Sequence, residues 1–116
     1  MQHWNQLEKS SQLRKLEKAS FERPQLIFKH SIRCGISAQS WHQVQAETEA
    51  LNGVADLHYL DLINYRSISN AVAADFGVPH QSPQAILLRD GKPIYQASHF
   101  SISADAIVAA AEKVIQ

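Results

Sequence analysis

The chain has a single cysteine, Cys34, and this scarcity limits the redox chemistry open to it. One cysteine cannot form a disulfide within the chain, so any disulfide must join Cys34 to another molecule. The same count excludes a secreted scaffold held by disulfides, and a free thiol is typical of a reducing compartment. We therefore expect a cytoplasmic protein.

The chain also lacks an excess charge of one sign and long apolar runs. Lys and Arg number 11, Asp and Glu number 11, and the formal net charge is zero. Without a strong field we expect neither nucleic acid nor a membrane as a partner. No apolar run approaches the ~18 residues that span a bilayer. The polar start, residues 1–6, has no apolar segment of a signal peptide.

The 116 residues are 45% hydrophobic, which predicts one domain over residues 1–116 with a real core. Hydrophobic periodicity and turn residues divide the chain into helices and strands. Ser10 or Ser11 is the expected N-cap of the first helix, Ser67 that of the third, and Gly77 closes the third. The predicted helices are 10–20, 37–51, 67–76 and 103–115. The predicted strands are 26–28, 54–62, 85–88 and 93–97, the last two joined at Asp90-Gly91.

This element order predicts an α/β fold. A strand, helix and strand in succession favour parallel pairing through a right-handed crossover, and the later hairpin adds antiparallel strands. The layout is that of the thioredoxin fold, with a mixed four-stranded sheet and helices on both faces. Trp4 can begin a fifth, short edge strand.

Cys34 lies between the first predicted core strand and the helix that carries Trp41. Unpaired N–H groups and the positive end of the helix dipole favour a thiolate there, and the thiolate is the nucleophile. Arg33, Lys29 or His30 can add positive potential. The alternative is a small buried apolar side chain, which is less frequent at a helix start.

Ser37 stands three residues after Cys34, where a two-cysteine redox site has its second cysteine. A serine can donate a hydrogen bond to the Cys34 sulfur but cannot become its disulfide partner. Disulfide exchange at Cys34 must therefore be intermolecular.

The residues around Cys34 resemble a known family. Residues 28–37, FKHSIRCGIS, are similar to the pattern F-K-H-S-T-x-C-P-I-S of the bacterial bacilliredoxin-like YtxJ family. The segments VPHQSPQ at 78–84, GK at 91–92 and ASH at 97–99 resemble later elements of that family, in order and with suitable spacing. The similarity covers nearly the whole chain.

This resemblance implies a monothiol thiol-disulfide oxidoreductase that removes a small thiol of the bacillithiol type from protein mixed disulfides. Cys34 matches the nucleophile, Ser37 the non-resolving serine and Pro83 a cis-proline beside the cysteine. The resemblance implies a small-thiol co-substrate without a bound cofactor, client proteins, and a flavin disulfide reductase as partner. We expect a monomer or weak dimer. The expected substrate-binding residues are Lys29, His30, Ser31, Arg33, Gly35, Ser82, Pro83 and His99.

Two departures from the family pattern leave alternatives open. Ile32 replaces a common Thr, and Gly35 replaces the usual Pro. Gly35 makes the motif similar to the Cys-Gly-Phe-Ser of monothiol glutaredoxins, which hold an iron–sulfur cluster between two protomers. The chain lacks the Thr-Val-Pro and Gly-Gly elements of those proteins. A third alternative is a non-catalytic adaptor, which predicts an unreactive Cys34.

The six histidines show no metal-ligand spacing, and we expect no metal site. His30, His80 and His99 lie on segments that this fold brings toward Cys34. They can tune the thiolate or recognise a small thiol. A structural role is an equal alternative for each of them.

Overall fold

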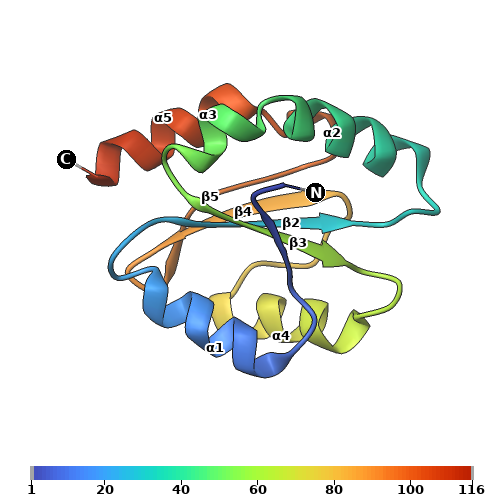
Figure 1. The fold of residues 1–116 in the computed structure, drawn as a ribbon. Helices are drawn as coiled ribbons and strands as arrows, with labels where there is room; N and C mark the ends of the chain where they lie inside the picture. Colours follow the sequence, from blue (N-terminus) through green and yellow to red (C-terminus); the bar gives the residue numbers. More distant parts are fainter. Residues whose placement is uncertain (1, 116) are drawn as a thin grey trace.

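The computed structural model describes residues 2–115. Five strands form one sheet, and helices cover both of its faces (Figure 1). The strands are β1 (Trp4–Gln6), β2 (Gln25–His30), β3 (Asp56–Asp61), β4 (Gln84–Arg89) and β5 (Lys92–Ser98). The helices are α1 (Ser10–Ala19), α2 (Gly35–Ala46), α3 (Thr48–Asn52), α4 (Arg66–Phe76) and α5 (Ala104–Ile115), with a 3-10 turn, η1, at His99–Ser101.

The strand order in the sheet is β1-β3-β2-β4-β5. β3 pairs parallel with both β1 and β2, whereas β4 is antiparallel to β2 and to β5. The strand at Trp4 is present, so the sheet has five strands rather than four. The expected α/β thioredoxin layout is confirmed.

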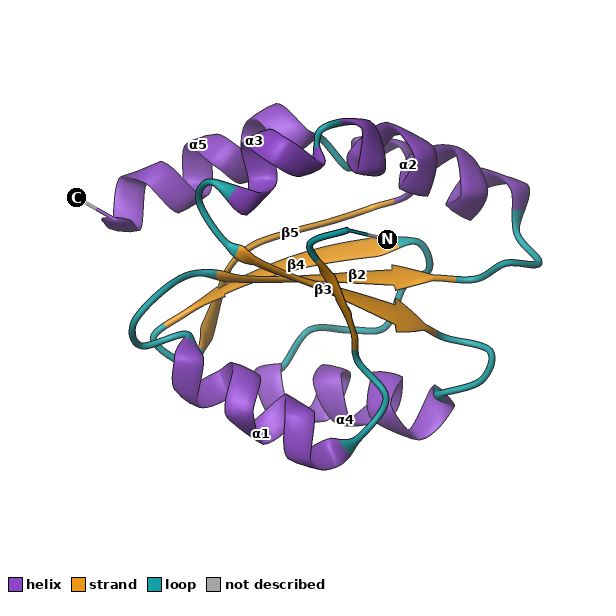
Figure 2. Cartoon of the chain, in the orientation of Figure 1, coloured by secondary structure: helices purple, strands orange, loops and turns teal. Residues whose placement is uncertain are grey.

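Two apolar layers hold the helices to the sheet. Figure 2 shows α2, α3 and α5 on one face of the sheet and α1 and α4 on the other. Neighbouring residues of a strand point to opposite faces. Leu26 and Phe28 of β2 accordingly pack in the layer beneath α2, α3 and α5. Ile27 packs in the layer against α1 and α4. β2 is buried along its full length, because it lies at the centre of the sheet with helices on both sides.

Tight turns lie where the sequence predicts them. Asp90 and Gly91 both have positive φ, 56° and 74°, the conformation of the two-residue hairpin turn between β4 and β5. Gly77 ends α4 in the left-handed conformation, with φ 65°.

Several predicted helix boundaries are wrong. The helix predicted over 37–51 is two helices, α2 and α3, which meet at Glu47. Thr48 Oγ1 donates to the Gln45 carbonyl oxygen at 2.6 Å, and such local side-chain bonds compete with the helical ladder. Thr48 Oγ1 also accepts from Trp4 Nε1 at 2.9 Å, which ties the break to β1.

The expected N-caps are also displaced. Lys9, rather than Ser10 or Ser11, is the N-cap of α1, and its N–H donates to the Gln12 side chain at 2.9 Å. Tyr65, rather than Ser67, is the N-cap of α4. The Asp61 carboxylate accepts from the Ile63 backbone N–H at 3.1 Å, which shapes the turn after β3 and starts α4 earlier.

Candidate functional site

Cys34 is the N-cap residue of α2, as the sequence predicts. Its backbone is extended, with φ −111° and ψ 120°, and its carbonyl oxygen accepts the first helical bond from Ala38 at 3.0 Å. The first turn of α2 carries no acidic residue, so no carboxylate opposes the positive end of the helix dipole. The side chain is partly exposed. Cys34 thus lies at the positive end of the α2 dipole and is accessible to a partner.

Ser37 is completely buried one turn after Cys34, and its hydroxyl contacts two groups at the end of β2. Ser37 Oγ lies 2.7 Å from His30 Nδ1 and accepts from the Ser31 backbone N–H at 3.0 Å. These bonds fasten α2 to the loop that carries Cys34. The expected hydrogen bond from Ser37 to the Cys34 sulfur is not among the bonds of the described chain, because the hydroxyl is directed to His30 and Ser31.

His30 lies in an aromatic cluster under α2. Its ring is 6.2 Å from Trp41, 5.7 Å from Tyr59 and 6.4 Å from Phe28 between centroids. Burial lowers the pKa of His30, and the charge of Asp61 and a hydrogen bond to Ser37 act in the opposite direction. The neutral imidazole is therefore the form that supports the cysteine loop. Trp41 and Tyr59 pack against each other in the same cluster, with ring centroids 4.8 Å apart.

Pro83 begins the segment that leads into β4, and the Ser82–Pro83 peptide bond is cis. The Pro83 carbonyl oxygen accepts from the His99 N–H at 3.1 Å, and the His99 carbonyl oxygen accepts from Ser40 Oγ at 3.2 Å. This chain of bonds joins the cis-proline segment and η1 to α2. Ser82 Oγ is buried, and no residue in the range 2–115 hydrogen-bonds to it.

The other residues predicted for substrate binding differ in how far they are exposed. Arg33 and Gly35 are exposed beside Cys34, whereas Ser31 is half-buried and serves through its backbone N–H. Lys29 is completely buried. Its Nζ lies 3.4 Å from both the Ser69 carbonyl oxygen of α4 and His80 Nδ1, so it points to the face opposite His30. Lys29 and His30 therefore belong to different layers.

Sequence reasoning missed two residues that organise this end of the sheet. Ser40 connects α2 to His99, and Arg66, at the start of α4, acts electrostatically on His80. Ser40 could be found from the helical spacing, because this spacing places it on the buried stripe between Ser37 and Val44. No sequence pattern points to Arg66, because only the path of the loop before β4 brings His80 back to α4.

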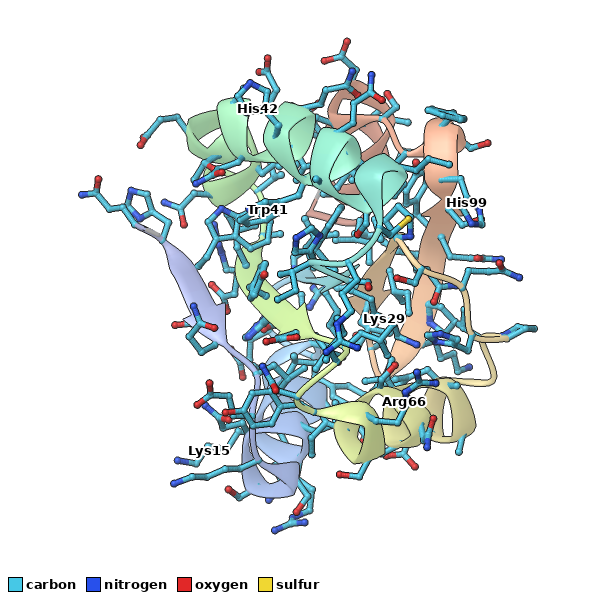
Figure 3. The ribbon with its side chains drawn as sticks, turned by 90° about the vertical axis from the view of Figure 1, so that its right-hand side faces the viewer. Lys15, Lys29, Trp41, His42, Arg66 and His99 are labelled. Carbon is cyan, nitrogen blue, oxygen red and sulfur yellow. The ribbon has the colours of Figure 1, made fainter. Side chains whose placement is uncertain are left out.

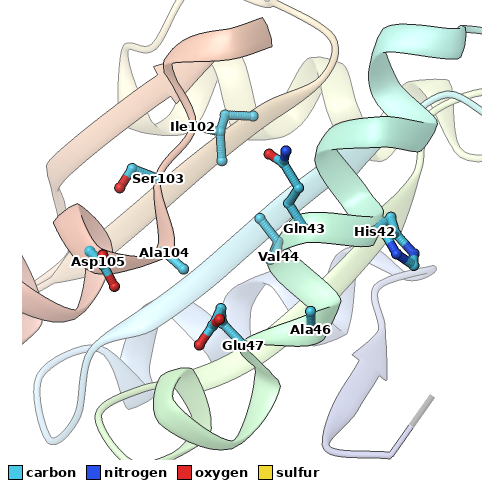
Figure 4. Close-up of a pocket in the computed structure, with 9 residues that line it drawn as sticks. All are labelled: His42, Gln43, Val44, Ala46, Glu47, Ile102, Ser103, Ala104 and Asp105. Carbon is cyan, nitrogen blue, oxygen red and sulfur yellow. The ribbon is translucent and has the colours of Figure 1, made fainter.

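A groove of about 440 Å³ lies elsewhere, between α2 and the start of α5 (Figure 4). Its lining contains none of the residues predicted for the thiol site. The thiol itself lies on the outer surface at the end of the sheet. Three large apolar side chains are exposed on neighbouring segments: Ile32 on the loop that carries Cys34, Ile36 on α2 and Phe100 on η1.

Comparison with known proteins agrees with this geometry. The family model of the monothiol bacilliredoxin BrxC matches residues 5–107, which include Cys34 and all of the sheet except Trp4, the first residue of β1. The chain belongs to the monothiol bacilliredoxin family. The bacilliredoxin resemblance found in the motif around Cys34 thus extends over the structured domain.

Solved structures place this bacilliredoxin among thioredoxin folds. A thioredoxin-fold protein assigned as an oxidoreductase is 26% identical, with a TM-score of 0.78 and 92% coverage of both chains. A mutant thioredoxin from Halobacterium salinarum is 14% identical, with a TM-score of 0.71 and coverage of 97% of this chain and 91% of that one. Thioredoxin from Malassezia sympodialis is 12% identical, with a TM-score of 0.72 and coverage of 94% and 88%. The last two show the fold alone.

Among residues 2–115 of this bacilliredoxin, no helix is long and apolar enough to cross a bilayer.

Proposed function

We propose that this bacilliredoxin uses Cys34 to take a small thiol of the bacillithiol type from mixed disulfides on client proteins. One observation carries the proposal: the only cysteine is a partly exposed N-cap of α2, and the residue one turn on is a buried serine held by His30. Cys34 is thus set up as a nucleophile with no resolving thiol beside it.

The first step is a thiol-disulfide exchange. The Cys34 thiolate attacks the small-thiol sulfur of the client mixed disulfide, and a new S–S bond forms as the old one breaks. The client leaves as a thiolate and takes a proton from water. Cys34 now carries the small thiol, and no electrons have been gained or lost overall.

The second step regenerates the protein. A second small thiol, as its thiolate, attacks the small-thiol sulfur bound to Cys34. The products are the disulfide of two small thiols and the Cys34 thiolate. Reduction of that disulfide takes two electrons, which we assign to a flavin disulfide reductase. We place the reaction in the cytoplasm, with the protein as a monomer or weak dimer.

The cis-proline segment supports this reaction by its position. It is bonded through His99 to α2, whose N-cap is Cys34. The buried Ser82 hydroxyl next to Pro83 is a polar group without a partner in the described chain, and a bound disulfide can supply one. Exposed Phe100 and Ile32 offer apolar contact to a protein client.

The test is to mix reduced protein with a client that carries bacillithiol on one cysteine and to weigh both proteins. We expect the client to lose one bacillithiol and Cys34 to gain it. The Cys34→Ser variant is the control and should leave the client modified. If wild-type Cys34 gains no adduct while the client stays modified, the proposal is wrong. A coloured dimer after anaerobic addition of iron, sulfide and small thiol would instead favour the iron–sulfur carrier.

A further inference from the structure

Lys29 is a buried charge without a counter-ion. Its side chain has no exposed surface, and its Nζ is near one carbonyl oxygen, that of Ser69, and one ring nitrogen, that of His80, each at 3.4 Å. The ion pairs of residues 2–115 are His3–Glu49 and Arg23–Asp56, so no described carboxylate neutralises Lys29. An ammonium buried in this way is unfavourable unless something else compensates it.

The contact with Lys29 fixes how His80 presents its ring. An ammonium group donates hydrogen bonds and cannot accept them, so His80 Nδ1 is the acceptor in its contact with Lys29, and the Ser69 hydroxyl, also 3.4 Å from Nδ1, can donate to the same atom. The ring proton of neutral His80 therefore lies on Nε2, on the side of the ring away from Lys29. His80 is an exposed residue of the loop before β4, so this N–H donor is open to a ligand.

A second cation, Arg66, acts electrostatically on the same ring. Burial is the main cause that lowers the pKa of His80, and the charges of Lys29 and Arg66 lower it further. Arg66 is exposed at the start of α4. Lys29 and Arg66 both lie against α4, because Lys29 Nζ is 3.4 Å from the Ser69 carbonyl oxygen and Arg66 begins that helix (Figure 3). The Lys29 ammonium and the Arg66 guanidinium thus both act on His80.

We propose that His80 and Arg66, backed by the buried ammonium of Lys29, bind a carboxylate of the low-molecular-weight thiol. This inference rests on the proposed function and names the chemistry by which the small thiol is selected. His80 is three residues before Pro83 and Lys29 is five residues before Cys34, so two of the three segments that carry the anion site lead directly into the thiol site, and Arg66 is added by α4. A carboxylate there receives charge-assisted hydrogen bonds from His80 Nε2 and the Arg66 guanidinium.

Two adducts of the wild-type protein test the site directly. Cys34 is loaded from an excess of bacillithiol disulfide, which carries carboxylates, or of cystamine, which carries none. NMR of histidine-labelled protein then follows the His80 ring against pH. In the bacillithiol adduct we expect a proton on Nε2 near neutral pH and a His80 pKa higher by about 1 than in the cysteamine adduct. An identical titration of His80 in both adducts would overturn the inference.

Exchange kinetics give a second, independent measurement. For Lys29→Met and His80→Gln we expect the rate constant with bacillithiol disulfide to fall roughly tenfold and that with cystamine to stay unchanged. Lys15→Met, an exposed lysine of α1, is the matched control and should change neither rate. Equal losses with both disulfides would show a merely structural role and reject the anion site. Cys34 would still form its adduct in that case, so the proposed function would stand.

Discussion

Ser37 Oγ and His30 Nδ1 lie 2.7 Å apart, and both residues are buried where β2 passes into the cysteine loop. The same oxygen accepts from the Ser31 N–H, so one hydroxyl connects the strand, the loop and the helix. Ser37, which stands where a two-cysteine site has its resolving cysteine, thus holds the loop that carries Cys34 in place.

Replacing Ser37 with Ala should therefore affect stability and positioning together. The change leaves the Ser31 N–H and His30 Nδ1 without this partner, and we expect a loss of about 1–3 kcal/mol in the free energy of unfolding. Urea denaturation measures the loss, and intact mass follows adduct formation on Cys34, which we expect to be slower but present. Ser11→Ala, at an exposed position of α1, is the control. Unchanged stability of Ser37→Ala would contradict the fastening role.

His58 should make the protein less stable in mild acid. Burial lowers its pKa to about 4, and its Nε2 is 2.8 Å from Gln25 Oε1. Between pH 6.5 and 4 the unfolded chain binds a proton that the folded chain does not, so stability falls as pH falls. This residue alone should account for a loss of about 2 kcal/mol between pH 7.5 and pH 5.

The His58→Gln variant should remove that share of the pH dependence, because glutamine can donate to Gln25 and does not titrate. Urea denaturation at pH 7.5 and pH 5 gives the comparison. His42→Gln, at an exposed site of α2, should keep the wild-type slope. A wild-type slope in His58→Gln as well would show that His58 is not its source.

Lys29→Met should stabilise the protein at neutral pH. Burial lowers the pKa of Lys29 from 10.5 to about 8, so the folded chain loses this proton before the unfolded chain does. Wild-type stability should therefore rise by about 1 kcal/mol between pH 7 and pH 9. The variant should be more stable at pH 7 and lack this rise. Equal pH profiles in denaturation experiments would count against a charged, buried Lys29.

Gly35→Pro should be tolerated. Gly35 is the first residue of α2, where the missing N–H of proline matters least, and a Cβ there meets nothing within 4 Å. Cys34 already has the extended backbone that a following proline requires. We expect a gain of about 0.4–1 kcal/mol in the free energy of unfolding. Gly77→Ala, at a φ of 65°, is the contrasting variant and should destabilise the fold.

Phe100→Ser should separate protein clients from small disulfides. Phe100 is 74% exposed on η1, which is bonded to α2 through Ser40 and His99. Loss of its apolar surface should slow exchange with a protein mixed disulfide severalfold and leave exchange with bacillithiol disulfide unchanged. Ile94→Ser, on β5 and 37% exposed, is the control. Equal rates of Phe100→Ser and wild type toward the client would exclude Phe100 from the client surface.

Local patterns in the sequence were sufficient for the framework of the fold. The apolar run of β2, the Asp90-Gly91 turn and the Gly77 helix end each depend on neighbouring residues, and each was predicted. The break at Glu47 was not, because Thr48 is tied to Trp4, 44 residues earlier in the chain. A helix pattern alone does not contain that contact.

The candidate site divides in the same way. The place of Cys34 at a helix start follows from the order of a strand and a helix, and it was predicted. The partners of Ser37 were not, because a hydroxyl one turn from a cysteine has several donors and acceptors within reach. Only the packed structure shows that the hydroxyl pairs with His30 Nδ1 and accepts from the Ser31 N–H.

The alternation of β2 has a consequence for how its motif is interpreted. Lys29 and His30 are neighbours in the chain, yet their side chains lie on opposite faces of the sheet. His80, 51 positions from Lys29, is its true neighbour. Adjacent residues of this motif therefore serve opposite faces of the sheet, and we expect Lys29 variants to change binding of the small-thiol carboxylate and His30 variants to change the position of the cysteine loop.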